Sequence, residues 1–324
     1  MKNLQNSDFA TIKEDELPLI SIVMGTYNGS LFLSDQINSI ISQSYTNIEI
    51  IIIDDCSTDN TFEILKVYQK NNSSIQIFQN TKNLGYIKNF ERGCSFATGK
   101  LIAFSDQDDY WHVDKLKKLQ NSIENSSLIY CNSTLCDESL KPIGVELSDR
   151  IKCMDFNNCL QQAIFGRIPG HAMLFKKDLL DRCLPFAEGV NHDWWLSFAA
   201  TTYEGIKYLP ESLVFYRQHT SNLFGAIGTK SKKHKSRIKK NEKVKEFGII
   251  RARIAAFSSF CPNAKNKEKR ILNKLSESYQ SFSLINNFQR MILFLKYQEL
   301  LLASKKRSLF RKFLFCLKMF LLIK

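Results

Sequence analysis

The stretch LISIVMGTYNG, residues 19–29, begins the pattern from which the fold is predicted. Its first seven residues form a short apolar run, which is typical of a buried strand. Residues 30–43 carry apolar side chains at helical spacing, and residues 48–54 form a second apolar run. This order of strand, helix and strand predicts a largely parallel sheet with helices on its faces.

The alternation continues along the chain and becomes less regular beyond Asp109. We expect an α/β fold, in which a mostly parallel mixed sheet is flanked by helices and followed by a basic helical extension. The further elements expected are helices at 58–70, 114–124, 156–164 and 191–203, and strands at 75–79, 101–105, 128–133, 171–175 and 212–217.

Charge is distributed unevenly over the 324 residues. Residues 1–220 contain 20 Lys and Arg against 27 Asp and Glu, a net charge of −7, whereas residues 221–324 contain 25 against 5, a net charge of +20. A protein that gripped a phosphate backbone with its main domain would be basic there. The acidic front part therefore argues against nucleic acid as a partner.

The nine cysteines are odd in number and form no C-x-x-C pair, which predicts free thiols in a reducing cytoplasm. The acidic residues 14–16 precede any apolar run, so no secretory signal is expected. No apolar run approaches the roughly 18 residues that a spanning helix needs. The nearest, 313–323, is interrupted by Lys318.

Polar residues follow three of the expected strands, where ligands bind in open α/β sheets. Carboxylates gathered at such an edge repel one another unless a cation lies among them. Oxygen ligands favour Mg²⁺ or Mn²⁺, and Mg²⁺ often completes its shell with substrate phosphates, which suggests a diphosphate substrate. The strand-end residues are Thr26, Tyr27 and Asn28, then Asp54 and Asp55, then Asp106, Gln107, Asp108 and Asp109.

Five motifs occur in a characteristic order: ISIVMGTYNG, IIIIDDCSTDNT, NLGYIKNF, IAFSDQDDYW and NHDWWL. Together they resemble family-2 glycosyltransferases of the GT-A fold, over residues 19–222. The resemblance implies an enzyme that takes a sugar from a nucleotide-diphospho-sugar. It divides the chain into an N-terminal extension, 1–18, a GT-A domain, 19–222, and a basic helical region, 223–324.

Matched to these motifs, the resemblance implies that Tyr27 and Asp55 contact the base and ribose, with Asp54 beside them. Thr26 and Asn28 belong to the same predicted substrate-binding set. In the D-x-D pair, Asp106 is directed to the ribose and the metal, and Asp108 to the metal that bridges the diphosphate.

The resemblance further implies that Asp193 is the catalytic base of an inverting transfer and that His219 reaches the diphosphate or the metal. A surface position for His219 is the alternative. Trp194 and Trp195 are expected to stack on a sugar or to raise the pKa of Asp193, although only one of them can face the cleft at helical spacing. His171 is expected to line the acceptor side.

Two departures leave the base of the donor open. Cys56 stands where glycine is common in the family, and Gly25 stands where a small hydroxyl residue is common. Gln107 and the HDWWL segment are similar to a rhamnosyltransferase-like branch, so dTDP-L-rhamnose and UDP-hexoses are both expected donors. A nucleotidyltransferase and a non-catalytic nucleotide-sugar-binding protein are the alternative functions, although GTYNGS lacks the cation that a nucleotidyltransferase needs.

The segment RKFLFCLKMFLLIK, 311–324, combines basic and apolar residues. It suits a helix lying in the headgroup layer of an anionic membrane. The alternative is a helical bundle that packs on the catalytic domain. We therefore expect a cytoplasmic enzyme at the inner face of the cell membrane, whose acceptor is a growing cell-surface polysaccharide or a lipid-linked oligosaccharide.

Overall fold

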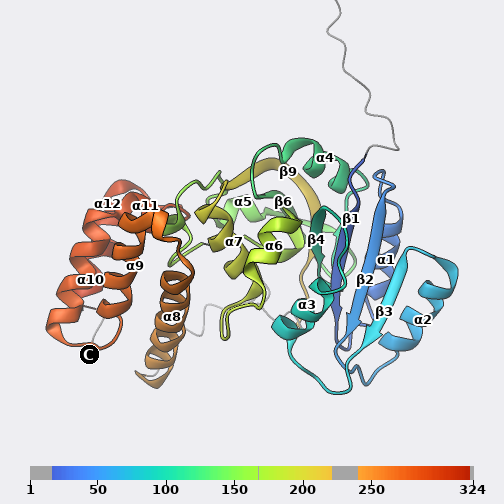
Figure 1. Ribbon diagram of the computed structural model, residues 1–324, viewed down its shortest axis with the longest axis horizontal. Helices are drawn as coiled ribbons and strands as arrows, with labels where there is room; N and C mark the ends of the chain where they lie inside the picture. Colours follow the sequence, from blue (N-terminus) through green and yellow to red (C-terminus); the bar gives the residue numbers. More distant parts are fainter. Residues whose placement is uncertain (1–16, 167, 221–239, 322–324) are drawn as a thin grey trace, which may run out of the picture.

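A mixed sheet of nine strands forms the centre of the described structure (Figure 1). The structure is a computed structural model and describes residues 17–166, 168–220 and 240–321. Four parallel strands come first along the chain, and their order in the sheet is β3, β2, β1, β4. They are β1 Ile20–Thr26, β2 Ile48–Asp54, β3 Ile75–Gln79 and β4 Leu101–Ser105.

The remaining strands complete the same sheet in the order β8, β6, β9, β5, with β7 paired to β6. β8 runs antiparallel to β4 and β6, whereas β6 and β9 run parallel to each other. Their bounds are β5 Tyr110–Trp111, β6 Leu128–Cys136, β7 Pro142–Glu146, β8 Met173–Lys176 and β9 Ile206–Arg217.

Each face of the parallel strands has its own apolar core, because alternate side chains of a strand point to opposite faces. Ile22 lies in the core with α1, α2 and α4, whereas Val23 lies in the core with α3, α6 and α7. These helices are α1 Leu33–Ile41, α2 Thr61–Asn71, α3 Tyr86–Cys94, α4 Lys115–Ser122, α6 Lys177–Cys183 and α7 His192–Thr202, and the short α5 is Leu147–Arg150.

The predicted α/β fold is confirmed, and the first four strands match their expected ranges to within one residue. The helix expected at 156–164 is wrong. Backbone bonds between Phe156 and Ile206 in both directions hold that end extended, and only a 3₁₀ turn, η2 Cys159–Gln161, follows. The strand expected at 171–175 likewise begins later, because Gly170–Ala172 forms a second 3₁₀ turn, η3.

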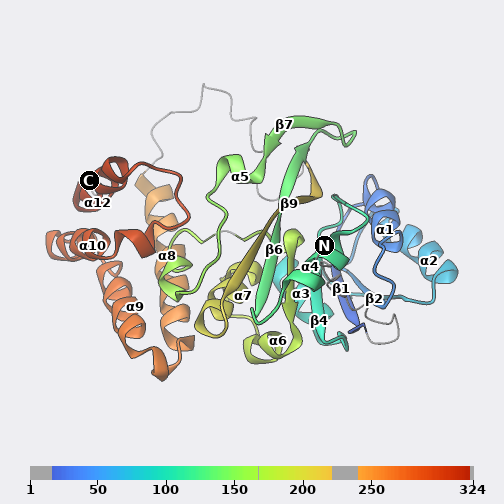
Figure 2. The same cartoon turned by 90° about the horizontal axis from the view of Figure 1, so that it is seen from above.

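Helices at the C-terminal end gather beside α7, at the opposite end of the molecule from α2 (Figures 1 and 2). Phe257 stacks on Phe198 of α7 with ring centroids 4.0 Å apart, so the apolar core continues from the sheet into these helices. They are α8 Lys240–Phe260, η5 Asn263–Lys265, α9 Asn266–Ser278, α10 Leu284–Lys296, α11 Gln298–Leu301 and α12 Leu309–Leu321.

The basic tail therefore forms a packed bundle in the part that is described. Lys312, Cys316 and Met319 of α12 are buried, and α12 packs against α10. Within the described ranges, no helix combines the length and the apolarity needed to cross a bilayer. The boundary expected near residue 222, the extension 1–16 and the last three residues of the segment 311–324 lie outside the described residues. All nine cysteines are free thiols, as predicted.

Candidate active site

The loops after β1 and β2 are tied together by the first of the two paired aspartates. Asp54 is fully buried, and its carboxylate accepts hydrogen bonds from Thr26 Oγ1 at 3.1 Å and from the Ser57 backbone N–H at 3.0 Å. Thr26 is itself only 2% exposed. Both residues belong to the predicted substrate-binding set; both are buried here, and the hydrogen bond between them fixes the shape of the loops above them.

The second paired aspartate, Asp55, fixes the loop that leads into α3. Its Oδ1 accepts hydrogen bonds from Asn80 Nδ2 at 2.7 Å and from the Leu84 N–H at 2.8 Å. Its Oδ2 accepts one bond, from the Gly85 N–H at 2.9 Å. Asp55 is 2% exposed, so any contact with a ligand would be through the remaining lone pair of Oδ2.

Tyr27 stands out from these loops and is held by the residue between the D-x-D carboxylates. Gln107 accepts a hydrogen bond from the Tyr27 N–H at 2.8 Å and donates one to the Tyr27 carbonyl at 3.1 Å. The Tyr27 residue is 46% exposed and is therefore accessible to a ligand. The neighbouring Asn28 accepts a hydrogen bond at its Oδ1 from the Thr58 N–H, which links the two loops.

The backbone conformation of Cys56 is one that glycine adopts readily. Its φ is 62°, in the left-handed region where a side chain is disfavoured. The chain turns here directly after Asp54 and Asp55, so this departure from the family pattern changes the side chain but keeps the turn.

The acidic loop after β4 is the most charged part of the site. His171 Nδ1 lies 3.5 Å from Asp106 Oδ2 and 3.5 Å from Asp109 Oδ2. On the other side, His219 Nε2 lies 2.9 Å from Asp108 Oδ2. Residues from the ends of β4 and β9 and from η3 therefore converge around the three acidic residues of this loop.

Asp109 shows that this loop fits a cation. Its Oδ1 accepts a hydrogen bond from the Arg217 N–H at 3.2 Å, but its buried Oδ2 has no hydrogen-bond partner among the described residues. Burial, with the charges of Asp108 and Asp106, raises the pKa of Asp109 well above its usual value. A divalent cation would satisfy the open oxygen and offset this repulsion.

The residues that could hold a metal ion in the structure differ in part from those that the sequence predicts. Ligand atoms of Asp106, Asp109 and His171 lie within 4.8 Å of one another, whereas the sequence assigns Asp106, Asp108 and His219. The structure pairs Asp108 with His219 at the rim of the same cluster. The sequence could have indicated Asp109 as a metal ligand, because this residue directly follows the D-x-D motif. It could not have indicated His171, because the position of His171 beside the acidic loop depends on the path of η3.

Two buried basic side chains hydrogen-bond to the backbone of the acidic loop and of η3. Arg217 donates from Nε to the Asp108 carbonyl at 2.9 Å and pairs with Asp35 at 2.8 Å. Lys115 is fully buried, donates from Nζ to the His171 carbonyl at 2.6 Å, and lies 3.1 Å from the centroid of the Trp111 ring. Burial lowers the pKa of Lys115 to about 7, although the charges of Asp109 and Asp106 oppose that shift.

Replacing Lys115 with methionine is expected to destabilise the fold by about 1–3 kcal/mol, because the His171 carbonyl loses its buried donor. Lys117→Met on the exposed side of the same helix, α4, is the matched control and should have almost no effect. Urea unfolding of the two variants measures the difference. Equal midpoints for both would show that the Lys115 hydrogen bond does not support His171.

Asp193 lies in the first turn of α7, close to η3. A Cβ atom at Gly170 would lie 3.7 Å from Asp193 Cβ and 3.5 Å from His192 Nε2, so the glycine allows η3 to approach α7 closely. Burial, with the charge of Asp106, raises the pKa of Asp193 to about 7. The acidic loop and Asp193, 87 positions apart in the chain, therefore share one electrostatic site.

Two aromatic neighbours complete this side. Tyr86, which the sequence did not single out, donates its hydroxyl to Asn191 Oδ1 at 2.7 Å. Burial, with the charge of Asp193, raises the pKa of Tyr86. Burial also lowers the pKa of His192 to about 4, so His192 is a neutral packing group at pH 7; its ring centroid lies 4.3 Å from that of Phe90.

The two tryptophans after Asp193 have different surroundings. Trp195 is 6% exposed, donates from Nε1 to the Cys183 carbonyl, and packs its ring against Phe260 of α8. Its prediction as a substrate contact is therefore wrong, because the C-terminal helices cover it. Trp194 is half-buried, and the Arg253 guanidinium lies 3.9 Å from its ring centroid.

The sequence resembles known glycosyltransferases over most of its length. Residues 21–182 match the sequence model of Glycosyl transferase family 2. The chain is 31% identical over 262 residues to the dTDP-rhamnosyl transferase RfbG of Shigella flexneri, an alignment that covers 75% of this chain and 88% of RfbG.

Two further relatives are matched over less than half of their length. The UDP-Glc:alpha-D-GlcNAc-diphosphoundecaprenol beta-1,3-glucosyltransferase WfgD of Escherichia coli is 36% identical over 117 residues, which cover 35% of this chain and 45% of WfgD. The match to TuaG of Bacillus subtilis, 38% identical over 101 residues, covers 31% of this chain and 40% of TuaG.

Solved structures share the fold at lower identity. S. aureus TarS 1-349 in complex with UDP-GlcNAc superposes with a TM-score of 0.56 at 16% identity, over 87% of this chain and 81% of that one. The mannosyltransferase PcManGT of Pyrobaculum calidifontis, in complex with GDP-Man and Mn2+, superposes with a TM-score of 0.54 at 16% identity, over 99% of this chain and 85% of that one.

Proposed function

Since this chain belongs to glycosyl transferase family 2, we propose that it is an inverting, cation-dependent enzyme that moves a sugar from a nucleoside diphosphate to an acceptor hydroxyl. The observation that supports this most strongly is the shared site of Asp193 and the acidic loop after β4. Asp193 lies outside the acidic loop and has a pKa of about 7. The carboxylates of the acidic loop lie near Asp109 Oδ2, which accepts no hydrogen bond from the described residues.

Asp193 is the base in this proposal. Its pKa of about 7 lets it be ionised at neutral pH and still accept a proton, which is the range where a general base works best. The acceptor hydroxyl gives its proton to an Asp193 oxygen as it attacks the anomeric carbon from the face opposite the diphosphate. Asp193 Oδ1 already accepts the Trp194 N–H at 2.7 Å, which holds the carboxylate in orientation.

The acidic loop holds the cation and the diphosphate. Asp106, Asp109 and His171 would bind Mg²⁺ or Mn²⁺, and Asp108 with His219 would lie next to the phosphates. When bound, the cation stabilises the negative charge that leaves with the nucleoside diphosphate. The Mn2+ in the complex of PcManGT supports this choice of cofactor.

The nucleotide would lie against the loops after β1 and β2. Tyr27 is exposed there and can stack on the base, while the remaining lone pair of Asp55 can accept one hydrogen bond. The family resemblance supports the same two residues as contacts of base and ribose. We propose dTDP-rhamnose or a UDP-hexose as donor, and RfbG supports the first choice.

For the acceptor we propose a growing cell-surface polysaccharide or a lipid-linked saccharide, in keeping with the diphosphoundecaprenol substrate named for WfgD. Such an acceptor is held at a membrane. We propose that the enzyme works at the inner face of the cell membrane and is attached through the basic C-terminal region, which has a net charge of +20 over residues 221–324.

Donor hydrolysis with Mn²⁺ tests the reaction, after a thermal-shift screen of dTDP-, UDP- and GDP-sugars has identified the donor. We expect one nucleotide-sugar to raise Tm in a Mn²⁺-dependent manner and to be hydrolysed slowly without acceptor. A nucleotidyltransferase would release pyrophosphate from a nucleoside triphosphate instead. A binding protein would show the Tm shift without turnover.

The pH dependence of the rate follows from Asp193. Because the active form is ionised and its pKa is about 7, kcat/KM is expected to fall about tenfold per pH unit below pH 6 and to level off above pH 8. Initial rates at a fixed Mn²⁺ concentration measure this profile. A flat profile between pH 5.5 and 8 would contradict the assignment of Asp193.

A further inference from the structure

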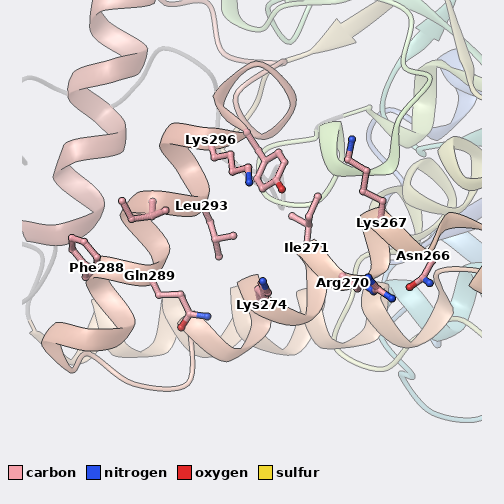
Figure 3. Close-up of a pocket in the computed structure, with 11 residues that line it drawn as sticks. Asn266, Lys267, Arg270, Ile271, Lys274, Phe288, Gln289, Leu293 and Lys296 are labelled. Carbon is pink, nitrogen blue, oxygen red and sulfur yellow. The ribbon is translucent and has the colours of Figure 1, made fainter.

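A groove with a basic rim runs between α9 and α10 (Figure 3). These helices lie apart from β4, which the acidic loop follows (Figure 1). Its volume is about 640 Å³. Four cationic side chains line it, and no acidic residue is among the lining residues. These four are Lys267, Arg270 and Lys274 of α9 and Lys296 of α10, all of them exposed.

The spacing of the cations places them together. Lys267, Arg270 and Lys274 follow one another at three and four positions, so they share one face of α9. None of them forms an ion pair with the described residues. The acidic residue of the first turn, Glu268, is turned away and accepts a hydrogen bond from Asn158 of the catalytic part. Their charge is therefore available to an anion.

The opposite wall of the groove is apolar and continues onto the surface. Phe288 and Ile292 line the groove and are 54% and 43% exposed. Leu284 and Ile285, one turn earlier on α10, are 73% and 79% exposed. The Phe288 ring meets Phe320 of α12 edge-on at 6.5 Å, which extends this surface to a second helix.

The surface of α12 has the same character. Several of its large apolar side chains are exposed, although a water-facing helix would present polar ones. They are Leu309, Phe310, Phe313, Leu314 and Leu321. An apolar surface on two neighbouring helices, bordered by four cations without acidic partners in the groove, matches the interfacial layer of an anionic membrane.

We infer that the α9–α10 groove binds the phosphate head group of an anionic phospholipid, while the exposed apolar side chains of α10 and α12 enter the acyl layer of the same bilayer. The inference rests on the membrane attachment proposed above and places it at named residues. A free phosphate would engage the cations alone, whereas the lipid also accounts for the apolar wall beside them. A nucleic acid would leave that wall exposed.

The test is co-sedimentation of the full chain with phosphatidylglycerol vesicles, with phosphatidylcholine vesicles for comparison. Removing three groove cations, in Lys267→Ala/Arg270→Ala/Lys274→Ala, is expected to weaken binding to phosphatidylglycerol roughly 100-fold, about fivefold per cation. The matched control, Lys70→Ala/Lys117→Ala/Lys141→Ala, removes the same charge from exposed lysines of the catalytic part and should bind like the parent chain.

A second variant tests the apolar contribution without touching a buried side chain. Leu284→Gln/Ile285→Gln is expected to weaken vesicle binding and to leave Tm unchanged. Equal losses in the groove and control triple variants would overturn the inference, because net charge alone would then explain binding. Binding to phosphatidylcholine vesicles as strong as binding to phosphatidylglycerol vesicles would overturn the anionic head group as the ligand.

Donor hydrolysis in detergent-free buffer separates this inference from the proposed reaction. The groove triple variant is expected to hydrolyse the donor at the parent rate, since α9 and α10 lie outside the site. If the parent chain binds vesicles but hydrolyses no donor, the proposed reaction is refuted and the inference about lipid binding in the groove stands. Hydrolysis without vesicle binding would refute the groove alone.

Discussion

Replacing Asp193 with asparagine is expected to reduce sugar transfer by about 10²–10⁴-fold, because the acceptor hydroxyl loses its base. Donor binding should persist, since the donor-binding loops and the acidic loop do not use Asp193 as a hydrogen-bond partner. Transfer rates and donor titrations with Mn²⁺ measure the two effects separately.

The stability of the same variant provides an internal check. Above pH 7 the native Asp193 is ionised although burial disfavours that charge, so a neutral asparagine of the same shape should keep Tm or raise it. Asp178→Asn is the matched control, because Asp178 is an exposed carboxylate at the corresponding position of α6. Transfer by Asp193→Asn at the control rate would remove Asp193 from the mechanism.

Replacing Asp106 with alanine is expected to abolish Mn²⁺-dependent donor binding, by about 100-fold or more. Asp106 belongs both to the ligand set predicted from the sequence and to the set that the structure brings together, so the expectation does not depend on which set is correct. Loss of one carboxylate removes a metal ligand and part of the negative charge that attracts the cation. Calorimetric titration of nucleoside diphosphate with and without Mn²⁺ measures it.

Two milder variants distinguish the sets. Asp109→Asn keeps the hydrogen bond from the Arg217 N–H but removes a carboxylate oxygen that accepts no hydrogen bond from the described residues. Asp108→Asn changes an oxygen that is already paired with His219. We therefore expect the Asp109 variant to lose more Mn²⁺ affinity. The reverse order would favour Asp108 and His219 as the ligands, and unchanged affinity in Asp106→Ala would exclude the loop as a metal site.

Much of the fold follows from local patterns. Strands β1, β2 and β4 are mostly apolar because both faces of this part of the sheet are covered, and Asp54 and Asp106 mark the ends of β2 and β4. The prediction of a helix at 156–164 failed because Phe156 pairs through its backbone with Ile206. No local sequence pattern reveals that pairing. The α1 and α7 helices, by contrast, lie within their expected ranges.

The site was harder to predict than the sheet. Its motif residues lie at the strand ends as expected, but the motif does not reveal that Thr26 and Asp54 are buried and hydrogen-bonded to each other. The path of η3, which brings His171 to Asp109, depends on tertiary packing against α7. Trp195 was assigned to the site because the sequence does not show that α8 returns to cover it.

The anomeric configuration of the transferred sugar tests the central claim most directly. A single base, Asp193, facing a cation-bound diphosphate predicts direct displacement, so the proton NMR spectrum of the product should show the configuration opposite to that of the donor. Product that keeps the configuration of the donor would contradict the assignment of Asp193 and the acidic loop to one inverting site.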